Sequence, residues 1–363
     1  MLLVSAMKVD KYVYDSLPDP IVLLGEDRSV IYANTAAQEL LECRPEGGDI
    51  ALSVRHPVVI DAIDRLREGA KNHAAEVSFP IPVERSFQLY AIRPEAKKIE
   101  SGQETKEKVE FVKFILLFRD ITLAARAEKM RVDFVANASH ELRSPLAALH
   151  GFVETLKGSA SEDKVAREHF LDIMERESHR MRRLLDDLLS LSRVEENEHI
   201  RPRDQVDVSM VLSSALDILQ MRAAERDMEI CINLPDDLPL IIGDVDQLIQ
   251  VFRNLTENAI NYGRESSKIN VSAETIVRIP ESGNRGVAIH VRDFGEGIDN
   301  ELIPRLTERF YRVDRARSRS DTMSSTGLGL AIVKHIVARH RGNLAIQSTI
   351  GEGSIFSVYL PIE

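Results

Sequence analysis

Tryptophan is absent from this sequence of 363 residues, and aromatic residues make up only 5% of it. Much of any core must therefore be aliphatic, which the hydrophobic content of 44% can supply. Cysteine is nearly absent as well, because Cys43 and Cys231 are the only two and lie far apart without Cys-x-x-Cys spacing. This argues against a disulfide framework or a zinc site and favours a reducing compartment. Both thiols are best explained as small hydrophobic groups.

Long apolar runs and an excess of positive charge are also missing. No stretch approaches the roughly 20 apolar residues of a membrane span, and the initial segment MLLVSAM meets Lys8 before it could form a signal-peptide core. The formal net charge of -11 argues against direct binding of nucleic acid. We therefore expect a cytoplasmic chain of two or three domains, with membrane association only if a further segment precedes residue 1.

The first domain, residues 10–120, has the pattern of a mixed α/β unit. Its strands are predicted where short apolar runs are bounded by turn residues: 21–24, 30–32, 87–92 and 109–118. A helix is expected over 35–41, after Asn34. The polar stretch 94–108 predicts a loop at a hairpin tip.

A continuous helix is expected to lead out of this domain. Residues 123–131 are rich in helix formers, and no glycine or proline intervenes before Phe134. The helix would run into residues 134–151, FVANASHELRSPLAALHG. Such a connection is rigid, unlike a Gly/Ser linker.

One histidine in this stretch, His140, is expected to face solvent. Apolar positions recur there at steps of four and three, forming a helical stripe: Leu142, Leu146, Leu149, Val153 and Leu156. At about 100° per residue, His140 points roughly 160° from the centre of that stripe. Glu141 could accept a proton from one ring nitrogen and leave the other as a nucleophile. Pro145 cannot donate to the carbonyl of Glu141, which predicts a local bend.

A second helix is predicted over residues 161–194. Its stripe also follows steps of three and four: Met181, Leu184, Leu188 and Leu191. One helical hairpin cannot bury both stripes, so two hairpins from two chains would form a four-helix bundle, which predicts a homodimer. A monomer whose stripes pack on its own C-terminal domain is the alternative.

Residues 200–363 alternate helices and strands. Helices are predicted over 206–223, 244–262 and 331–338, and strands over 228–234 and 287–291. Asn254, Asn258 and Asn261 recur on one helix at spacings of four and three, which indicates use of their amides because asparagine is a mediocre helix former. Asp293 ends a strand and opens a glycine-containing turn, DFGEGI, where it could accept a hydrogen bond from an exocyclic amine.

A second glycine-rich turn, TGLGL at residues 326–330, precedes an apolar helix. A turn of this kind at a helix start can cradle phosphate. The pattern is neither a P-loop nor a Rossmann fingerprint, since GxxxxGK[ST] and a GxGxxG after the first strand are both missing.

Together these segments resemble the sensor histidine kinases of two-component systems. Residues 139–146 (SHELRSPL) resemble the H box, and the asparagine helix, DFGEGI, ERFYRVD and TGLGL resemble the N, G1, F and G2 boxes. Residues 17–24, 30–34 and 118–122 resemble a PAS domain. With ERFYRVD, this combination is most similar to the phosphate-regulon sensor subgroup.

The resemblance implies a multidomain α+β protein. A PAS sensor domain would occupy residues 10–120, and a helical hairpin for dimerisation and phosphotransfer would occupy 121–198. A Bergerat-type α/β sandwich that binds ATP would occupy 200–363. The PAS domain could hold an unidentified small ligand, although no residue selects one, and its pocket could be empty.

The resemblance also implies residue roles in the helical hairpin. His140 would be the phosphoacceptor, assisted by Glu141. The Ser144 hydroxyl stands where most relatives have threonine, and would help position water for dephosphorylating the partner protein.

In the ATP-binding domain, Asn258 would hold Mg²⁺ between the phosphates, with Asn254 nearby. The residues implied at the base are Tyr262 along the adenine, Asp293 on its amino group, and Gly295 and Gly297 around the pocket. Those implied at a mobile lid and at the phosphates are Phe310, Arg312 as a γ-phosphate contact, Thr326, Gly327, Leu328 and Gly329. The polar run at residues 316–325 also predicts a flexible lid, which a nucleotide could order. Two departures predict altered ATP affinity, because Asn261 replaces a frequent Lys or Arg and Ser325 replaces a frequent Gly.

The sequence therefore predicts a protein histidine kinase that moves the γ-phosphoryl of Mg-ATP to His140 and then to an aspartate on the receiver domain of a response regulator. Phosphatase activity on that regulator is expected as well. Three alternatives stay open: a chain that mainly dephosphorylates the regulator, a PAS-driven scaffold that binds ATP without phosphotransfer, and another Bergerat ATPase. The handedness of the loop at residues 157–162 would decide between phosphorylation within one chain and between two.

Overall fold

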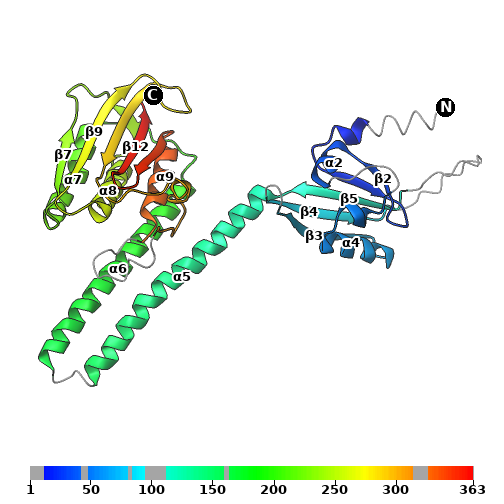
Figure 1. Ribbon diagram of the computed structural model, residues 1–363, viewed down its shortest axis with the longest axis horizontal. Helices are drawn as coiled ribbons and strands as arrows, with labels where there is room; N and C mark the ends of the chain where they lie inside the picture. The colour runs from blue at the N-terminus through cyan, green and yellow to red at the C-terminus, as the bar shows by residue number, and fades with distance from the viewer. Residues whose placement is uncertain are drawn as a thin grey trace, which may run out of the picture. The chain divides into compact units, whose positions relative to one another are not determined.

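The computed structural model describes residues 12–41, 48–80, 84–94, 112–158, 163–313 and 326–362. The chain divides into two compact units, Met1–Asp133 and Phe134–Glu363. Helix α5 (Thr122–Lys157) begins in the first unit and continues in the second (Figure 1). Among the helices of the described residues, none combines the length and the apolar character that a membrane span requires.

The first unit is a five-stranded antiparallel sheet in the order β2-β1-β5-β4-β3. Its strands are β1 (Ile21–Leu24), β2 (Val30–Ala33), β3 (Asn72–Phe79), β4 (Arg85–Ile92) and β5 (Phe114–Asp120). Its helices are α2 (Thr35–Leu41), α3 (Ile50–Ser53) and α4 (Pro57–Arg67). The predicted hairpin and helix after Asn34 are confirmed. Residues 109–111 of the last predicted strand lie outside the described residues.

Aromatic side chains, scarce in the sequence, are concentrated in the core of this unit. Phe87 and Phe118 are fully buried and meet edge to face, with ring centroids 6.4 Å apart. The ring of Phe79 packs against both. Asn34 is buried too. Its amide nitrogen donates to carbonyls before β1, and its amide oxygen accepts from the first N–H of β1 and from an N–H of α2, so a polar group holds the hairpin and the helix together.

The junction between β5 and α5 is fixed by hydrogen bonds. The Asp120 carboxylate accepts from the Thr122 backbone N–H at 2.8 Å and from Arg85 at 2.7 Å. Burial alone would raise the pKa of Asp120, but the hydrogen bonds from Thr122 and Arg85 outweigh it and hold the pKa at about 2. The start of α5 is thereby attached to the neighbouring strand β4.

Helices α5 and α6 (Lys164–Glu196) form the predicted hairpin. Helix α5 stays helical through Pro145, whose ring is buried, so the proline does not end the helix. In α6, Leu184 and Leu191 are buried in the core of the C-terminal domain. These two leucines pack on the chain's own C-terminal domain, because that domain offers an apolar surface to α6.

The C-terminal part of the second unit contains a five-stranded sheet in the order β11-β12-β10-β9-β7, in which only the β7–β9 pair is parallel. These strands are β7 (Glu229–Asn233), β9 (Lys268–Ile276), β10 (Gly286–Arg292), β11 (Asn343–Thr349) and β12 (Gly353–Pro361). A small sheet pairs β6 (Asp204–Val206) with β8 (Ile241–Gly243).

Three helices cover one face of this large sheet (Figure 1). They are α7 (Val208–Ala224), α8 (Val245–Tyr262) and α9 (Gly329–Arg339), and a short 3-10 helix, η1 (Ile303–Arg305), precedes the F-box segment. Alternating residues of β10, such as Val287, Ile289 and Val291, join the apolar faces of these helices in one core. This is the predicted α/β sandwich.

Candidate active site

His140 lies on the exposed surface of α5, as the helical spacing predicted. One turn further on, the Ser144 hydroxyl donates to the His140 carbonyl at 3.3 Å. The Glu141 carboxylate points to α6, where it pairs with Arg180 at 3.2 Å. Assistance to the His140 ring by Glu141 therefore requires that its carboxylate leave Arg180.

Asp293 directly follows β10 and is held in place by two backbone hydrogen bonds. Its side chain is buried, and its Oδ1 atom accepts from the backbone N–H groups of Gly295 at 2.9 Å and Ser354 at 3.3 Å. Burial raises the pKa of Asp293, against the effect of those two hydrogen bonds. Since both bonds fall on Oδ1, Oδ2 is left as an acceptor for a ligand.

Two glycines near Asp293 lie where other backbone segments pack too closely to admit any side chain. A Cβ at Gly295 would collide with the backbone of Tyr262, and a Cβ at Gly297 would collide with the backbone of Thr349. Gly297 also has a φ of 74°, which glycine adopts readily. Tyr262 itself is 50% exposed at the end of α8, where an adenine could lie along its ring.

The three asparagines of α8 have different partners. Asn254 is buried and donates to the Gly329 carbonyl at 3.3 Å, which links α8 to the start of α9. Asn258 is half-buried. The amide oxygen of Asn261 accepts from Arg222 of α7 at 3.2 Å, and Arg222 is also 3.5 Å from the Glu257 carboxylate. Asn254 therefore lies at the start of α9, and Asn261 lies against α7.

Phe310 is buried, whereas the sequence placed it in a mobile lid. Its ring packs on Phe134 of α5 with centroids 5.8 Å apart, and its backbone N–H donates to the Gly327 carbonyl at 2.9 Å. Phe310 has a φ of 62°, which is uncommon outside glycine. Arg312 is half-buried, and its Nε atom is buried without a hydrogen bond among the described residues. The predicted lid at residues 316–325 lies outside them.

The glycine-rich turn contacts Asp187 of α6, which belongs to none of the sequence motifs. The Thr326 hydroxyl donates to the Asp187 carboxylate of α6 at 2.7 Å, and the Leu328 N–H lies 3.3 Å from the Thr326 oxygen. Asp187 follows Leu184 by three residues and precedes Leu191 by four, so a carboxylate inside an apolar stripe was the signal that could have identified it. Arg222 carried no comparable signal.

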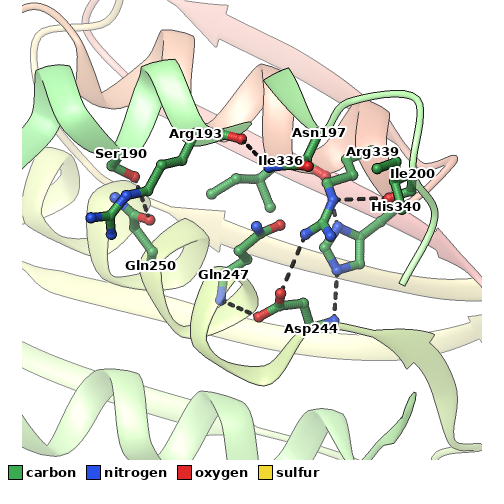
Figure 2. A network of polar contacts seen from close by, with 10 residues as sticks. All are labelled: Ser190, Arg193, Asn197, Ile200, Asp244, Gln247, Gln250, Ile336, Arg339 and His340. Carbon is green, nitrogen blue, oxygen red and sulfur yellow. Dashed lines mark hydrogen bonds and ion pairs between the residues drawn. The ribbon is translucent and has the colours of Figure 1, made fainter. Parts of the chain in front are cut away.

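A polar network joins the C-terminal end of α6 to α8 and α9 (Figure 2). The Ser190 hydroxyl donates to Gln250 at 3.0 Å. Asp244 caps α8 by accepting from the Gln247 N–H at 3.2 Å, and it also pairs with Arg339 at 3.2 Å. His340 is fully buried, and burial lowers its pKa, consistent with a neutral ring that accepts from the Asp244 N–H at 2.9 Å. These contacts make His340 a structural residue.

The residues present fit a magnesium nucleotide. Asp293 offers a buried acceptor, Gly295 and Gly297 let the backbone around it pack closely, and the buried Arg312 Nε has no hydrogen bond among the described residues. The described residues contain no group of three acidic, histidine or cysteine side chains that could hold a metal alone. An Mg²⁺ ion that binds together with a nucleotide takes most of its ligands from phosphates and waters.

Comparison with known proteins agrees with this geometry. The family models described as "Histidine kinase-, DNA gyrase B-, and HSP90-like ATPase" and "His Kinase A (phospho-acceptor) domain" match residues 243–363 and 130–197, and a PAS domain model matches 11–76. The chain belongs to the sensor histidine kinase family and is a histidine kinase. It is 32% identical over 348 residues to the phosphate regulon sensor protein PhoR of Pseudomonas aeruginosa, across 95% of this chain and 72% of PhoR. The predicted similarity to the phosphate-regulon sensors is confirmed.

Two further relatives cover less of the chain. The sensor protein kinase WalK of Staphylococcus epidermidis is 34% identical over 69% of this chain, which spans only 40% of WalK. The solved structure of the Acinetobacter baumannii histidine kinase AdeS is 26% identical over 62% of this chain and 98% of that chain, with a TM-score of 0.47. The predicted fold class, with PAS, helical-hairpin and ATP-binding parts, is confirmed by the family matches and the structure.

Proposed function

We propose that His140 is the phosphoacceptor of this kinase and that Mg-ATP, bound around Asp293, is the phosphoryl donor. The observation that carries the proposal is the exposed His140 ring on α5, within the segment that matches the phospho-acceptor family model. The buried Asp293 acceptor and the close-packed glycine turn beside it, both in the matched ATPase segment, support the donor site. The same proposal assigns residues 10–120 to the PAS sensor domain, 121–198 to the dimerisation and phosphotransfer hairpin, and 200–363 to the ATP-binding domain.

The reaction requires a neutral imidazole. A ring nitrogen of His140 attacks the γ-phosphorus, a P–N bond forms, the P–O bond to the β-phosphate breaks, and ADP leaves. Glu141 would hold the proton on the other ring nitrogen after its carboxylate leaves Arg180. Asn258 would hold Mg²⁺, which offsets phosphate charge when bound, and Arg312 would contact the γ-phosphate. The phosphoryl group then passes from His140 to a receiver aspartate.

We infer that the kinase acts as a homodimer. Three leucines of the α5–α6 hairpin are 45% to 58% exposed in the single chain: Leu146, Leu185 and Leu189. Such side chains on two adjacent helices would be buried in a four-helix bundle with a second hairpin. A receiver domain that reaches His140 would approach the same helix from its exposed side.

Phosphatase activity toward the phosphorylated regulator is the second activity we propose, and Ser144 would position the attacking water. Its hydroxyl lies one helical turn from His140 and is exposed. Ser144→Ala is expected to slow regulator dephosphorylation at least about tenfold, in the range of one lost catalytic hydrogen bond, and to leave His140 labelling intact. The rate at which a labelled receiver domain loses phosphate measures the first effect.

Ser139→Ala is the matched control. Ser139 is also exposed on α5, and its hydroxyl donates to the Val135 carbonyl at 2.8 Å, in the same way as that of Ser144. This variant should keep wild-type rates of both labelling and dephosphorylation. If Ser144→Ala and Ser139→Ala behave alike, Ser144 has no role in a phosphatase step.

The kinase function is tested by incubating the chain with γ-labelled Mg-ATP and then with a panel of receiver domains. The proposal predicts labelling of the chain, followed by rapid transfer to one receiver. Release of labelled inorganic phosphate without labelled protein would instead favour an ATPase. Stable nucleotide binding without either product would favour the scaffold.

A further inference from the structure

Asp187 places a negative charge at the turn that opens α9. The Asp187 carboxylate accepts from the Thr326 hydroxyl at 2.7 Å, and the Leu328 N–H lies 3.3 Å from the same hydroxyl oxygen. Helix α9 begins directly after Leu328, at Gly329. A carboxylate from α6 is therefore hydrogen-bonded within the proposed phosphate-binding turn.

The start of a helix attracts anions. Its first backbone N–H groups have no partners within the helix, and the aligned peptide dipoles make this end positive. A nucleotide phosphate and the Asp187 carboxylate therefore both favour the start of α9. With the carboxylate in place, a phosphate would have to approach a fixed negative charge in a partly desolvated site.

The residues around Asp187 act on the pKa of its carboxyl in both directions. Burial raises the pKa of Asp187, the Thr326 hydrogen bond lowers it, and the negative charge of Glu257 raises it further. Arg253 and Arg183 act in the opposite direction. An anion in this position is thus disfavoured by its environment, and an additional anion would be disfavoured more strongly.

Other contacts along the same helices hold α6 and α5 in place. Arg309 pairs with Glu195 of α6 at 2.6 Å and lies over the Phe134 ring of α5. The Ser190–Gln250 hydrogen bond lies one turn beyond Asp187 on α6 (Figure 2). These contacts fix α6 against the ATP-binding domain, so the position of the Asp187 backbone depends on how the helical hairpin packs.

We propose that Asp187 competes with the phosphates of ATP for the start of α9, so that docking of α6 on the ATP-binding domain lowers ATP affinity and release of α6 raises it. The inference rests on the proposed ATP site. It gives the hairpin, which α5 connects to the PAS domain, a direct effect on nucleotide binding.

The test compares Asp187→Asn and Asp187→Ala with the wild-type chain by calorimetric titration with Mg-ATP and with adenosine. Asp186→Asn is the matched control, because Asp186 is the adjacent, exposed carboxylate of α6. Asp187→Asn and Asp187→Ala should each bind Mg-ATP about five- to tenfold more tightly, the scale of a single screened charge interaction. Adenosine has no phosphate, so its affinity should stay unchanged.

Three results would overturn the competition. The first is equal Mg-ATP affinity in Asp187→Asn and Asp186→Asn. The second is an equal gain in affinity for Mg-ATP and for adenosine. The third is a gain in Mg-ATP affinity in Asp187→Ala alone. The last would assign the effect to the lost hydrogen bond instead of the charge. Absence of Mg-ATP binding in the wild type and every variant would reject the proposed ATP site, and this inference with it.

Discussion

Gly297→Ala should unfold the ATP-binding domain well before the wild-type chain. The alanine would have to adopt a φ of 74°, and its Cβ would overlap the backbone of Thr349. The loop cannot move aside easily, because the Gly351 N–H donates to the Glu296 carbonyl and the Ile298 N–H donates to Ser348, both at 2.8 Å. Strain and overlap together should remove about 3 to 4 kcal/mol of stability.

Gly283→Ala separates the two contributions. Gly283 has a φ of 71°, but a Cβ there would meet nothing within 4 Å. That variant should lose only about 1 kcal/mol of stability, the cost of the positive φ alone. Hydrogen exchange of the α8 amides, measured without nucleotide, reports the stability of this domain by itself. Equal exchange in the two variants would show that the contact with Thr349 has no energetic role.

Asp293→Asn should weaken ATP binding on the order of 100-fold, because a site built around a hydrogen bond penalises its loss. In the wild type, Oδ1 is occupied by two backbone N–H groups and Oδ2 would accept from the adenine amine. An asparagine that keeps its oxygen toward those N–H groups would turn its own amide donor toward the amine. Preference for ATP over GTP should fall as well, since guanine presents an acceptor at that position.

Titration with Mg-ATP and Mg-GTP measures both effects, with Asp299→Asn as the control. Asp299 is an exposed aspartate on the same segment, where it accepts from the Glu301 N–H at 3.0 Å. Because burial raises the pKa of Asp293 and the charged form is the stronger acceptor, wild-type ATP affinity should fall as the pH drops through that raised pKa. Unchanged ATP affinity in Asp293→Asn would show that the adenine does not bind at Asp293.

Local patterns in the sequence were sufficient for most elements around the site. The helix predicted over 244–262 is α8, with Asp244 as its N-cap, and the strand predicted over 287–291 is β10. The unbroken helix before His140 is also present. These segments have strong periodicity and clear caps, so neighbouring residues alone determine them.

Contacts between distant segments could not be predicted in the same way. Asp187 and Thr326 are separated by 139 positions, and Arg222 and Asn261 by 39. Their pairing depends on how α6 and α7 pack against α8 and α9, which no local pattern specifies. The burial of Phe310 against Phe134 was missed for the same reason, since the sequence shows only an aromatic residue beside a polar run.

Labelling with γ-labelled Mg-ATP shows whether His140 receives the phosphoryl group. His150 lies on the same helix and is exposed, so His150→Ala is a control for loss of any surface histidine of α5. The assignment of His140 as phosphoacceptor predicts acid-labile labelling of the wild type and of His150→Ala, as expected for a P–N bond, and none of His140→Ala. Equal labelling of wild type and His140→Ala would contradict it.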